Sequence, residues 1–311
     1  MWRGIVIFPK VPNVPFIAWR TFSLAISIVM VLASIALMSI KGFNLGIDFR
    51  GGILVEVRTQ GPANLGEMRE TLGGLGLGEV SLQGFGTASD VLIRIQEQEG
   101  GERAQQAAVE KVRAALGPTV EYRRIEAVGP QVSSELLWNG MMAVGLGMLG
   151  ILIYIWFRFE WQFAAAGVLA LAHDVVSTIG LFSLLGLEFN LTSVAALLTV
   201  AGYSINDTVV VFDRVRDNLR KYKAMPMPDL LNLSNNQTLS RTVMTGGTTI
   251  LALLGLYLLG GDVLSGFSLA MLFGVVCGTY STVFVAVPLL LYMRLPRRAP
   301  TEAKPDGAVA E

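Results

Sequence analysis

The chain has 311 residues, of which 52% are hydrophobic and only 15% are charged, and its mean hydropathy is +0.55. A soluble domain carries about 25% charged residues, so the composition excludes an ordinary soluble protein and indicates a polytopic membrane protein. The 24 basic and 24 acidic residues balance, which excludes a general attraction to nucleic acid. The single cysteine, Cys277, and the single histidine, His173, argue against a disulfide, a metal site or another cofactor.

Six apolar runs are each long enough to cross a bilayer, which needs about 20 residues. The first run follows basic residues but is too long for a secretory signal peptide and has no small-x-small cleavage site, so we expect an uncleaved anchor. The predicted fold class is therefore a mainly α-helical membrane protein with six transmembrane helices. The runs lie at residues 22–40, 137–157, 163–185, 191–212, 243–259 and 267–293.

Basic residues alternate between the short segments that flank these runs. They occur before the first run, between the second and third, between the fourth and fifth, and after the sixth, but not in the links 186–190 and 260–266. The positive-inside rule then places both termini in the cytoplasm and the long segment 41–135 outside. The predicted division is a cytoplasmic N-terminus (1–21), a first helix (22–40), an outer domain (41–135), five further helices (136–293) with a cytoplasmic link (213–241), and a cytoplasmic tail (294–311).

The outer segment is polar and glycine-rich and is long enough for one small domain. Its patterns predict strands at 53–59, 79–85, 91–96 and 119–125 and helices at 64–72 and 102–116. The order β-α-β-β-α-β is that of a ferredoxin-like sandwich. This fold hosts many activities, and the segment contains no Cys or His, so we expect no enzyme here.

The segment Gly46-Ile47-Asp48-Phe49-Arg50-Gly51-Gly52 leads from the first run into this domain. One interpretation is a tight backbone turn in which Gly51 and Gly52 adopt conformations that side chains forbid. The other is a fixed joint that couples the domain to the membrane helices, with Gly46, Asp48, Gly51 and Gly52 as its coupling residues. Chemistry alone favours the turn.

Two ionisable residues, His173 and Asp174, lie near the middle of the third run. As neighbours on a helix they are expected to point in different directions. Asp174 is the stronger candidate for function, because it falls on a small and polar stripe, whereas His173 either takes part or only hydrogen-bonds within the bundle. The other members of the stripe are Gly167, Ala170, Ser177 and Thr178.

The fourth run carries Asp207 six residues before Asp213, the first charge after it. At about 1.5 Å per residue, Asp207 lies roughly 9 Å inside that boundary, where a carboxylate costs at least a few kcal/mol unless it is paired, protonated or used. Burial favours its neutral form and a nearby cation favours its charged form, so reversible protonation is expected. The alternatives are a permanent ion pair and a protonated carboxyl bonded to a backbone carbonyl.

Asp207 shares a predicted small and polar face of the fourth run with Asn206. The best candidate cation for Asp207 is Arg241, at the mouth of the fifth run. Before it, residues 230–239 are predicted to form a separate short helix, which either lies along the membrane surface or is an ordinary solvated link. The other members of the polar face are Thr192, Ala195, Ala196, Thr199, Gly202 and Tyr203.

The sixth run has a small residue at every fourth position, from Gly266 and Ala270 to Gly274, Gly278 and Thr282. Small residues let helices approach closely, so this stripe predicts helix packing rather than a site.

Four of these motifs resemble the SecF family, accessory membrane subunits of the bacterial Sec protein-export machinery. They are residues 46–52, His173-Asp174, the stretch SINDTVVVFDR from Ser204 to Arg214, and LSRT at residues 239–242. The resemblance extends from the first run to the sixth. It implies half of a resistance-nodulation-division bundle in the bacterial cytoplasmic (inner) membrane, with the proton-path Asp of the family at Asp207 and its essential Arg at Arg241.

The resemblance also implies partners. SecD would supply six further spans, and the pair would assist the SecYEG channel by using the proton-motive force after the step driven by SecA. YajC and YidC are further expected partners, and the cargo is a translocating preprotein. The expected proton pathway comprises Asp207, Arg241, Asp174, His173 and Asn206. Rival hypotheses are a proton-coupled exporter of small molecules or lipids from the same superfamily, and a structural chaperone of membrane assembly.

Overall fold

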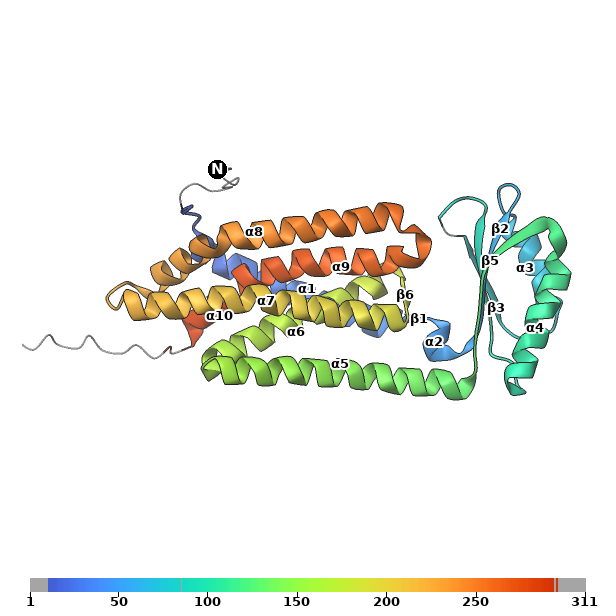
Figure 1. Ribbon diagram of the computed structural model, residues 1–311, viewed down its shortest axis with the longest axis horizontal. Coiled ribbons are helices and arrows are strands. Elements are labelled where there is room, and N and C mark those ends of the chain that lie inside the picture. Colours follow the sequence, from blue (N-terminus) through green and yellow to red (C-terminus); the bar gives the residue numbers. More distant parts are fainter. Residues whose placement is uncertain (1–10, 85, 294, 296–311) are drawn as a thin grey trace, which may run out of the picture.

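The computed structural model describes residues 11–84, 86–293 and 295. The predicted segment before residue 11, the predicted strand end at Phe85 and most of the predicted tail lie outside the described residues. Figure 1 shows a long helical bundle with a small sheet domain at one end. We call residues 52–128 the β-domain.

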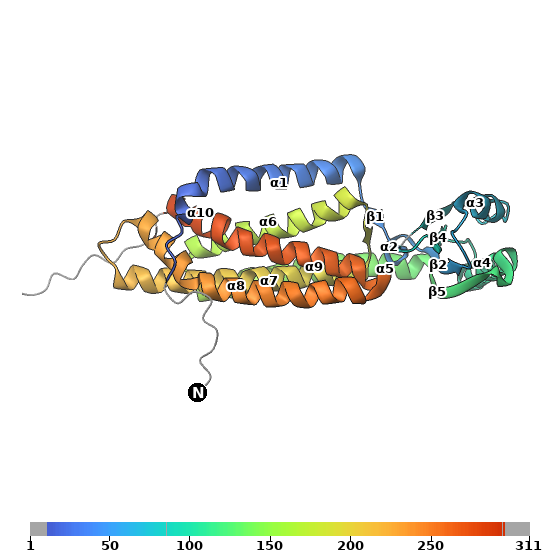
Figure 2. The ribbon, with the colours of Figure 1, turned by 90° about the horizontal axis from the view of Figure 1, so that it is seen from above.

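Six helices among the described residues are long and apolar enough to cross a membrane, which confirms the predicted multi-pass membrane protein. The first joins η1 (Phe16–Trp19) to α1 (Arg20–Lys41), and Figure 2 shows α1 along one edge of the bundle. The next four are α5 (Pro130–Arg158), α6 (Trp161–Leu185), α7 (Leu191–Lys221) and α8 (Met227–Leu259). The sixth consists of α9 (Gly261–Ser281), η3 (Thr282–Ala286) and α10 (Val287–Tyr292).

The sixth span is interrupted by the π-helical turn η3. Pro288 follows at the start of α10 and supplies no backbone N–H to the helix. Side chains of two neighbouring helices donate hydrogen bonds to carbonyl groups of the turn. Ser23 Oγ donates to the carbonyl of Phe284 (3.2 Å), and Asn235 Nδ2 donates to that of Val283 (3.3 Å). The turn is therefore held from both sides, by α1 and by α8.

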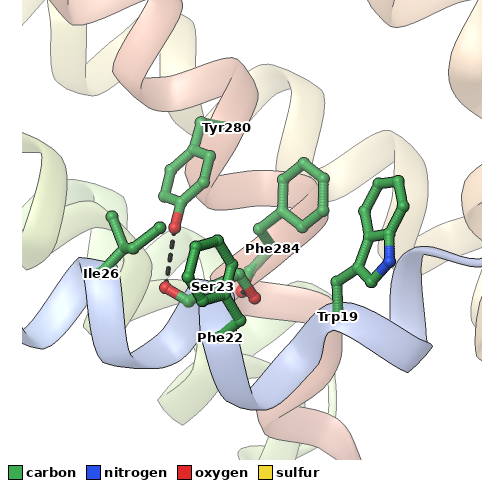
Figure 3. Close-up of a pocket in the computed structure, with 6 residues that line it drawn as sticks. All are labelled: Trp19, Phe22, Ser23, Ile26, Tyr280 and Phe284. Carbon is green, nitrogen blue, oxygen red and sulfur yellow. Dashed lines mark hydrogen bonds between the residues drawn. The ribbon is translucent and has the colours of Figure 1, made fainter.

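Tyr280 fastens α1 to the sixth span. Its hydroxyl donates to the carbonyl of Ser23 (2.7 Å) and lies 3.1 Å from the hydroxyl of Ser27. Beside this contact an apolar groove opens between the two helices (Figure 3). It is lined by Trp19, Phe22, Ser23, Ile26, Tyr280 and Phe284.

Small residues bring the helices into close contact, as the stripe in the sixth run predicts. A Cβ on Gly274 would lie 2.2 Å from Val200 Cγ2, and one on Gly278 would lie 3.0 Å from Ser204 Cβ. A Cβ on Gly180 of α6 would lie 2.4 Å from Ser34 Cβ of α1, so these two helices also pack closely. The packing interpretation of this stripe is confirmed.

The predicted short helix at 230–239 is wrong, because α8 runs without a break from Met227 to Leu259. No glycine or proline separates the two predicted segments, so nothing in the backbone ends the helix. Leu230 and Leu231 are fully buried. This part of the helix therefore packs inside the protein instead of lying along a membrane surface.

The β-domain has the predicted ferredoxin-like order. Its elements are β2 (Gly52–Thr59), α3 (Leu65–Gly73), β3 (Val80–Gly84), β4 (Asp90–Ile95), α4 (Gly101–Leu116), η2 (Gly117–Thr119) and β5 (Val120–Val128). The sheet order is β3-β4-β2-β5, and every neighbouring pair is antiparallel. Ile53, Val55 and Val57 alternate into a core with Leu72 of α3 and Val112 of α4.

Asp90 at the start of β4 is a buried carboxylate with strong partners. It accepts two hydrogen bonds from the Arg58 guanidinium, at 2.7 and 2.9 Å, and one from the Thr87 hydroxyl at 2.6 Å. The Arg58 bonds, followed by the Thr87 bond, hold the pKa of Asp90 well below its usual range, although burial opposes them. The charged form therefore stabilises the domain.

We expect Asp90→Asn to destabilise the β-domain at pH 7 by about 1–2 kcal/mol, since Arg58 is partly exposed to solvent. Because the folded pKa is lowered, the stabilisation is complete above the unfolded pKa near 4 and is lost as the pH falls below it. The difference from wild type should therefore shrink at pH 3. Amide-exchange protection factors in β2 and β4 measure it, with Glu110→Gln, an exposed site, as control. Equal protection in Asp90→Asn at pH 7 would refute the assignment.

Candidate functional site

Asp207 is buried between α7 and α8 with incomplete hydrogen bonding. Its side chain is 1% exposed, and its Oδ1 atom accepts only a long bond of 3.4 Å from the Thr245 hydroxyl. The second oxygen, Oδ2, has no hydrogen-bond partner within the described part of the chain. A carboxylate held this way is costly, whereas a protonated carboxyl is far less so. The geometry therefore suits a group that changes its protonation state.

Arg241 lies one helical turn before Thr245 on α8 and is exposed. It attracts Asp207 through space, but between these two described residues no ion pair is formed within 4.0 Å. Within the described residues the structure therefore lacks the permanent ion pair to Arg241 that is one predicted alternative for Asp207.

Asp174 is the centre of a second buried cluster, between α6, α7 and α9. Its Oδ2 atom accepts hydrogen bonds from Ser204 (2.5 Å) and Ser281 (2.6 Å). Its Oδ1 atom accepts a bond from the Cys277 thiol (3.5 Å) and lies 2.9 Å from Nδ1 of His173. The carboxyl is fully buried and well partnered, in contrast to that of Asp207.

The prediction that His173 and Asp174 point in different directions is wrong, since their side chains touch. Residues adjacent on a helix are about 100° apart, and the His173 ring turns across this gap toward the carboxylate. Its other nitrogen, Nε2, is buried without a partner among the described residues. His173 therefore belongs to the Asp174 cluster.

His173, Asp174 and Cys277 have donor atoms within 4.8 Å of one another, a spacing that can hold a metal ion. A metal-ligating histidine normally donates its second N–H to a partner, which His173 Nε2 lacks within the described residues. Asp174 also already accepts hydrogen bonds from two hydroxyl groups. The donor set fits a hydrogen-bond network better than a metal site.

Sequence reasoning missed Ser204, Ser281 and Cys277 as partners of Asp174. Ser204 is three residues before Asp207, so α7 carries a residue of each cluster one turn apart. Cys277 and Ser281 are four residues apart on α9, on the face of its small stripe. That spacing is equally typical of helix packing, so it does not by itself identify Cys277 and Ser281 as partners of Asp174.

The predicted polar face of the fourth run divides into two faces. Ala196 and Asp207 are buried and Tyr203 is half-buried, whereas Asn206 is exposed. The exposed face runs along the whole spanning part of α7. Its members are Thr192, Ala195, Thr199, Gly202 and Asn206.

The segment 46–52 contacts the end of α7 nearest the β-domain. It contains α2 (Ile47–Arg50) and follows β1 (Asn44–Leu45), which pairs in parallel with β6 (Glu188–Phe189) just before α7. Asp48 Oδ2 accepts a hydrogen bond from the backbone N–H of Leu191, the first residue of α7 (3.0 Å). Asp48 thus caps the helix that carries Asp207.

The glycines of this segment are needed for steric reasons. A Cβ on Gly46 would lie 2.5 Å from Glu188 Oε1, and one on Gly52 would lie 2.5 Å from the carbonyl oxygen of Ile95. Gly51 and Gly52 have φ angles of 72° and 112°, which side chains disfavour. Both interpretations of the segment are therefore compatible with its geometry: it is a tight turn, and it touches α7.

A second contact links the β-domain to the same place. Arg94 of β4 donates hydrogen bonds to Asn44 Oδ1 (2.8 Å) and to Glu188 Oε2 (2.5 Å). The β-domain is therefore attached to the β1–β6 pair through a side chain as well as through the backbone.

Together these features define a class: a six-span membrane transport bundle with buried carboxylates and a ferredoxin-like domain between its first and second spans. The family description "Protein export membrane protein SecD/SecF, C-terminal" matches residues 108–295, and "SecD/SecF GG Motif" matches residues 36–63. The chain belongs to the SecD/SecF family and, within it, to the SecF proteins.

Curated relatives agree along nearly the whole chain. It is 46% identical to the protein translocase subunit SecF of Rhodobacter capsulatus, covering 94% of this chain and 92% of that protein. It is 42% identical to the protein translocase subunit SecDF of Brucella abortus, covering 99% of this chain and 41% of that one.

Solved structures extend the likeness to three dimensions. SecDF of Thermus thermophilus, described as a translocon-associated membrane protein, matches 92% of this chain and 39% of its own, with a TM-score of 0.82 and 37% identity. A SecDF structure in a super-membrane-facing form matches 94% of this chain and 39% of its own, with a TM-score of 0.66 and 36% identity.

Proposed function

We propose that this chain is an auxiliary subunit of the Sec preprotein translocase which, with SecD, uses the proton-motive force to promote export after the SecA-driven step. Membership of the SecF proteins supports a role in protein translocation. The observation that carries the proton-driven part is the buried Asp207, one oxygen of which lacks a hydrogen-bond partner among the residues that the structure describes, on a helix whose other end is capped by Asp48.

The proposed cycle begins when a proton from the outer side neutralises Asp207. Its attraction to Arg241 weakens and the helices repack; deprotonation toward the cytoplasm resets them. Asp48 and Glu188 transmit the movement of α7 to the β-domain, because Asp48 caps the start of α7 and Glu188, in the strand before it, accepts a hydrogen bond from Arg94 of the β-domain. One charge crossing 100 mV releases about 2.3 kcal/mol, so several protons bias a moving chain appreciably. His173 and Asp174 are the second part of the proton pathway.

The exposed face of α7 is the proposed contact with SecD. Small residues and one asparagine on a membrane helix favour a helix partner over lipid, and Thr199, Gly202 and Asn206 provide such a surface. Relatives in which this chain matches about two fifths of a longer SecDF protein support the pairing. Asn206 then takes its role at the interface and not in the buried cluster.

The remaining assignments complete the proposal. The protein lies in the bacterial inner membrane with both termini in the cytoplasm and the β-domain outside, where it meets the emerging preprotein. SecYEG is the channel partner, with YajC and YidC as further partners. The role is mechanical transport and not enzymatic catalysis. The two SecDF structures are about equally identical to this chain but match it with TM-scores of 0.82 and 0.66. This difference supports a SecF part that takes up more than one arrangement.

Depletion of the chain separates this proposal from a small-molecule or lipid exporter. We expect depleted cells to accumulate unprocessed preproteins, because export loses its proton-driven stage, while resistance to toxic compounds stays unchanged. Pulse-chase labelling of a secreted protein measures the first effect and growth inhibition measures the second. Normal preprotein processing together with lost resistance would favour the exporter.

A further inference from the structure

We propose that Tyr203 and Thr279 form a proton relay between Asp207 and the β-domain end of the bundle, with Gly246 providing the space for bridging water. This inference rests on the proposed function, since it concerns the route by which Asp207 receives its proton. Three helices that pack on one another, α7, α8 and α9, contribute one residue each (Figure 1).

Three buried oxygen atoms in this region have no hydrogen-bond partner among the described residues. They are Asp207 Oδ2, Tyr203 Oη and Thr279 Oγ1. Buried polar atoms in native proteins are nearly always bonded, to protein or to ordered water. Three unpartnered oxygens in one region therefore indicate a place that water occupies.

Tyr203 lies between Asp207 and the β-domain end of α7, as a proton route from that end requires. The two residues are four apart on α7, so they lie on one side of the helix about 6 Å apart along its axis. Tyr203 is the one nearer to Leu191, where α7 meets Asp48 and the β-domain. A proton that enters from this end passes Tyr203 before it reaches Asp207.

Gly246 brings the other two oxygens to one point. A Cβ built on Gly246 would lie 3.5 Å from Tyr203 Oη and 3.4 Å from Thr279 Oγ1. Both oxygens therefore face the bare backbone of α8 at this glycine. A larger residue would take up the space between them.

The nearby threonines of α8 are less suitable carriers. Thr245 Oγ1 lies 3.0 Å from the carbonyl of Arg241, and Thr249 Oγ1 lies 2.8 Å from the carbonyl of Thr245. Thr249 donates its hydroxyl proton to its own helix, and Thr245 shares its proton between its own helix and Asp207 Oδ1. Both lie near the Tyr203 hydroxyl, but within the described part of the chain Tyr203 Oη and Thr279 Oγ1 have no hydrogen-bond partner within 3.5 Å.

The relay consumes no chemical group of the protein. Water beside Gly246, held by the Thr279 hydroxyl, receives a proton from the outer side and passes one to Tyr203 Oη while the original Tyr203 proton leaves toward Asp207. One O–H bond forms on the tyrosine as another breaks, and the carboxylate becomes a carboxyl group. The hydroxyls of Tyr203 and Thr279 end as they began, after reorienting.

The test is the rate at which the Asp207 carboxyl becomes protonated after a pH drop on the β-domain side. The chain is reconstituted with its SecD partner in lipid vesicles, and infrared absorption reports the carboxyl, assigned by its loss in Asp207→Asn. We expect Tyr203→Phe, which removes only the hydroxyl, and Gly246→Ala, which fills the space, to slow protonation about tenfold or more. A pH drop on the opposite side should give the wild-type rate in both variants, which a merely structural defect would not.

Matched controls lie on the same helix. Gly247→Ala adds a Cβ with no atom within 4 Å, and Tyr257→Phe removes the hydroxyl of a tyrosine that is 39% exposed. Both should keep the wild-type rate. Wild-type rates in Tyr203→Phe and Gly246→Ala, with Asp207 still titrating, would overturn the relay alone. Absence of any change at Asp207 in the wild-type chain would overturn the relay and the proposed function together.

Discussion

Asp207→Asn is expected to abolish the part of preprotein export that depends on the proton-motive force. Asparagine has the shape of aspartic acid but cannot gain or lose a proton, so the chain stays in one state. Because a buried carboxylate with an unpartnered oxygen costs stability, its neutral replacement should fold and assemble with SecD at least as well as wild type. Export should fall to the level that wild type shows when the gradient is dissipated.

The measurement is the chase of a stalled preprotein out of inner-membrane vesicles, with and without an ionophore. The matched control is Asp217→Asn, an exposed aspartate ten residues further along the same helix. It should retain the full response to the gradient. A gradient-dependent chase in Asp207→Asn equal to that of wild type would exclude proton transfer at this residue.

Gly52→Ala is expected to disconnect the β-domain from the membrane helices. The residue has a φ angle of 112°, and a Cβ there would lie 2.5 Å from the backbone oxygen of Ile95. Backbone cannot move aside as a flexible side chain can, so the pairing of β2 with β4 at Ile53 and Ile95 must shift. The strained conformation alone costs about 1–3 kcal/mol, and the contact adds to it.

The expected phenotype is lost export with retained proton uptake at Asp207, because the carboxyl site lies far along α7 from the joint. Amide exchange in β2 and β4 should rise, and the chase assay should fail. Gly73→Ala serves as control, since its Cβ meets no atom within 4 Å at the end of α3. Normal protection and export in Gly52→Ala would show that the joint tolerates a side chain and is not under steric constraint.

The spans and the β-domain could be predicted because their signals are local. A run of about 20 apolar residues is sufficient to identify a membrane helix, and alternation or helical spacing identifies a strand or helix in the domain. Asp207 could be singled out for the same reason, as one charge in an apolar run. Such signals need no knowledge of neighbours.

The partners of these residues could not be predicted, because they depend on packing between distant segments. Ser204 and Ser281 contact Asp174 from α7 and α9, and nothing in their local sequence distinguishes them from packing residues. The direction of the His173 ring is a rotamer choice made within the bundle. Similarly, a small and polar residue suits a helix interface whether its partner is in the same chain or in another, so the sequence predicts one shared face for Asn206 and Asp207.

The most direct test of the account follows the Asp207 carboxyl in the assembled complex by infrared absorption, while the pH is varied and a proton gradient is applied and removed. The account predicts that the carboxyl band appears and disappears as the gradient is switched, and that Asp207→Asn lacks this band. A carboxyl that stays in one protonation state throughout, in a complex that still exports preprotein, would contradict it.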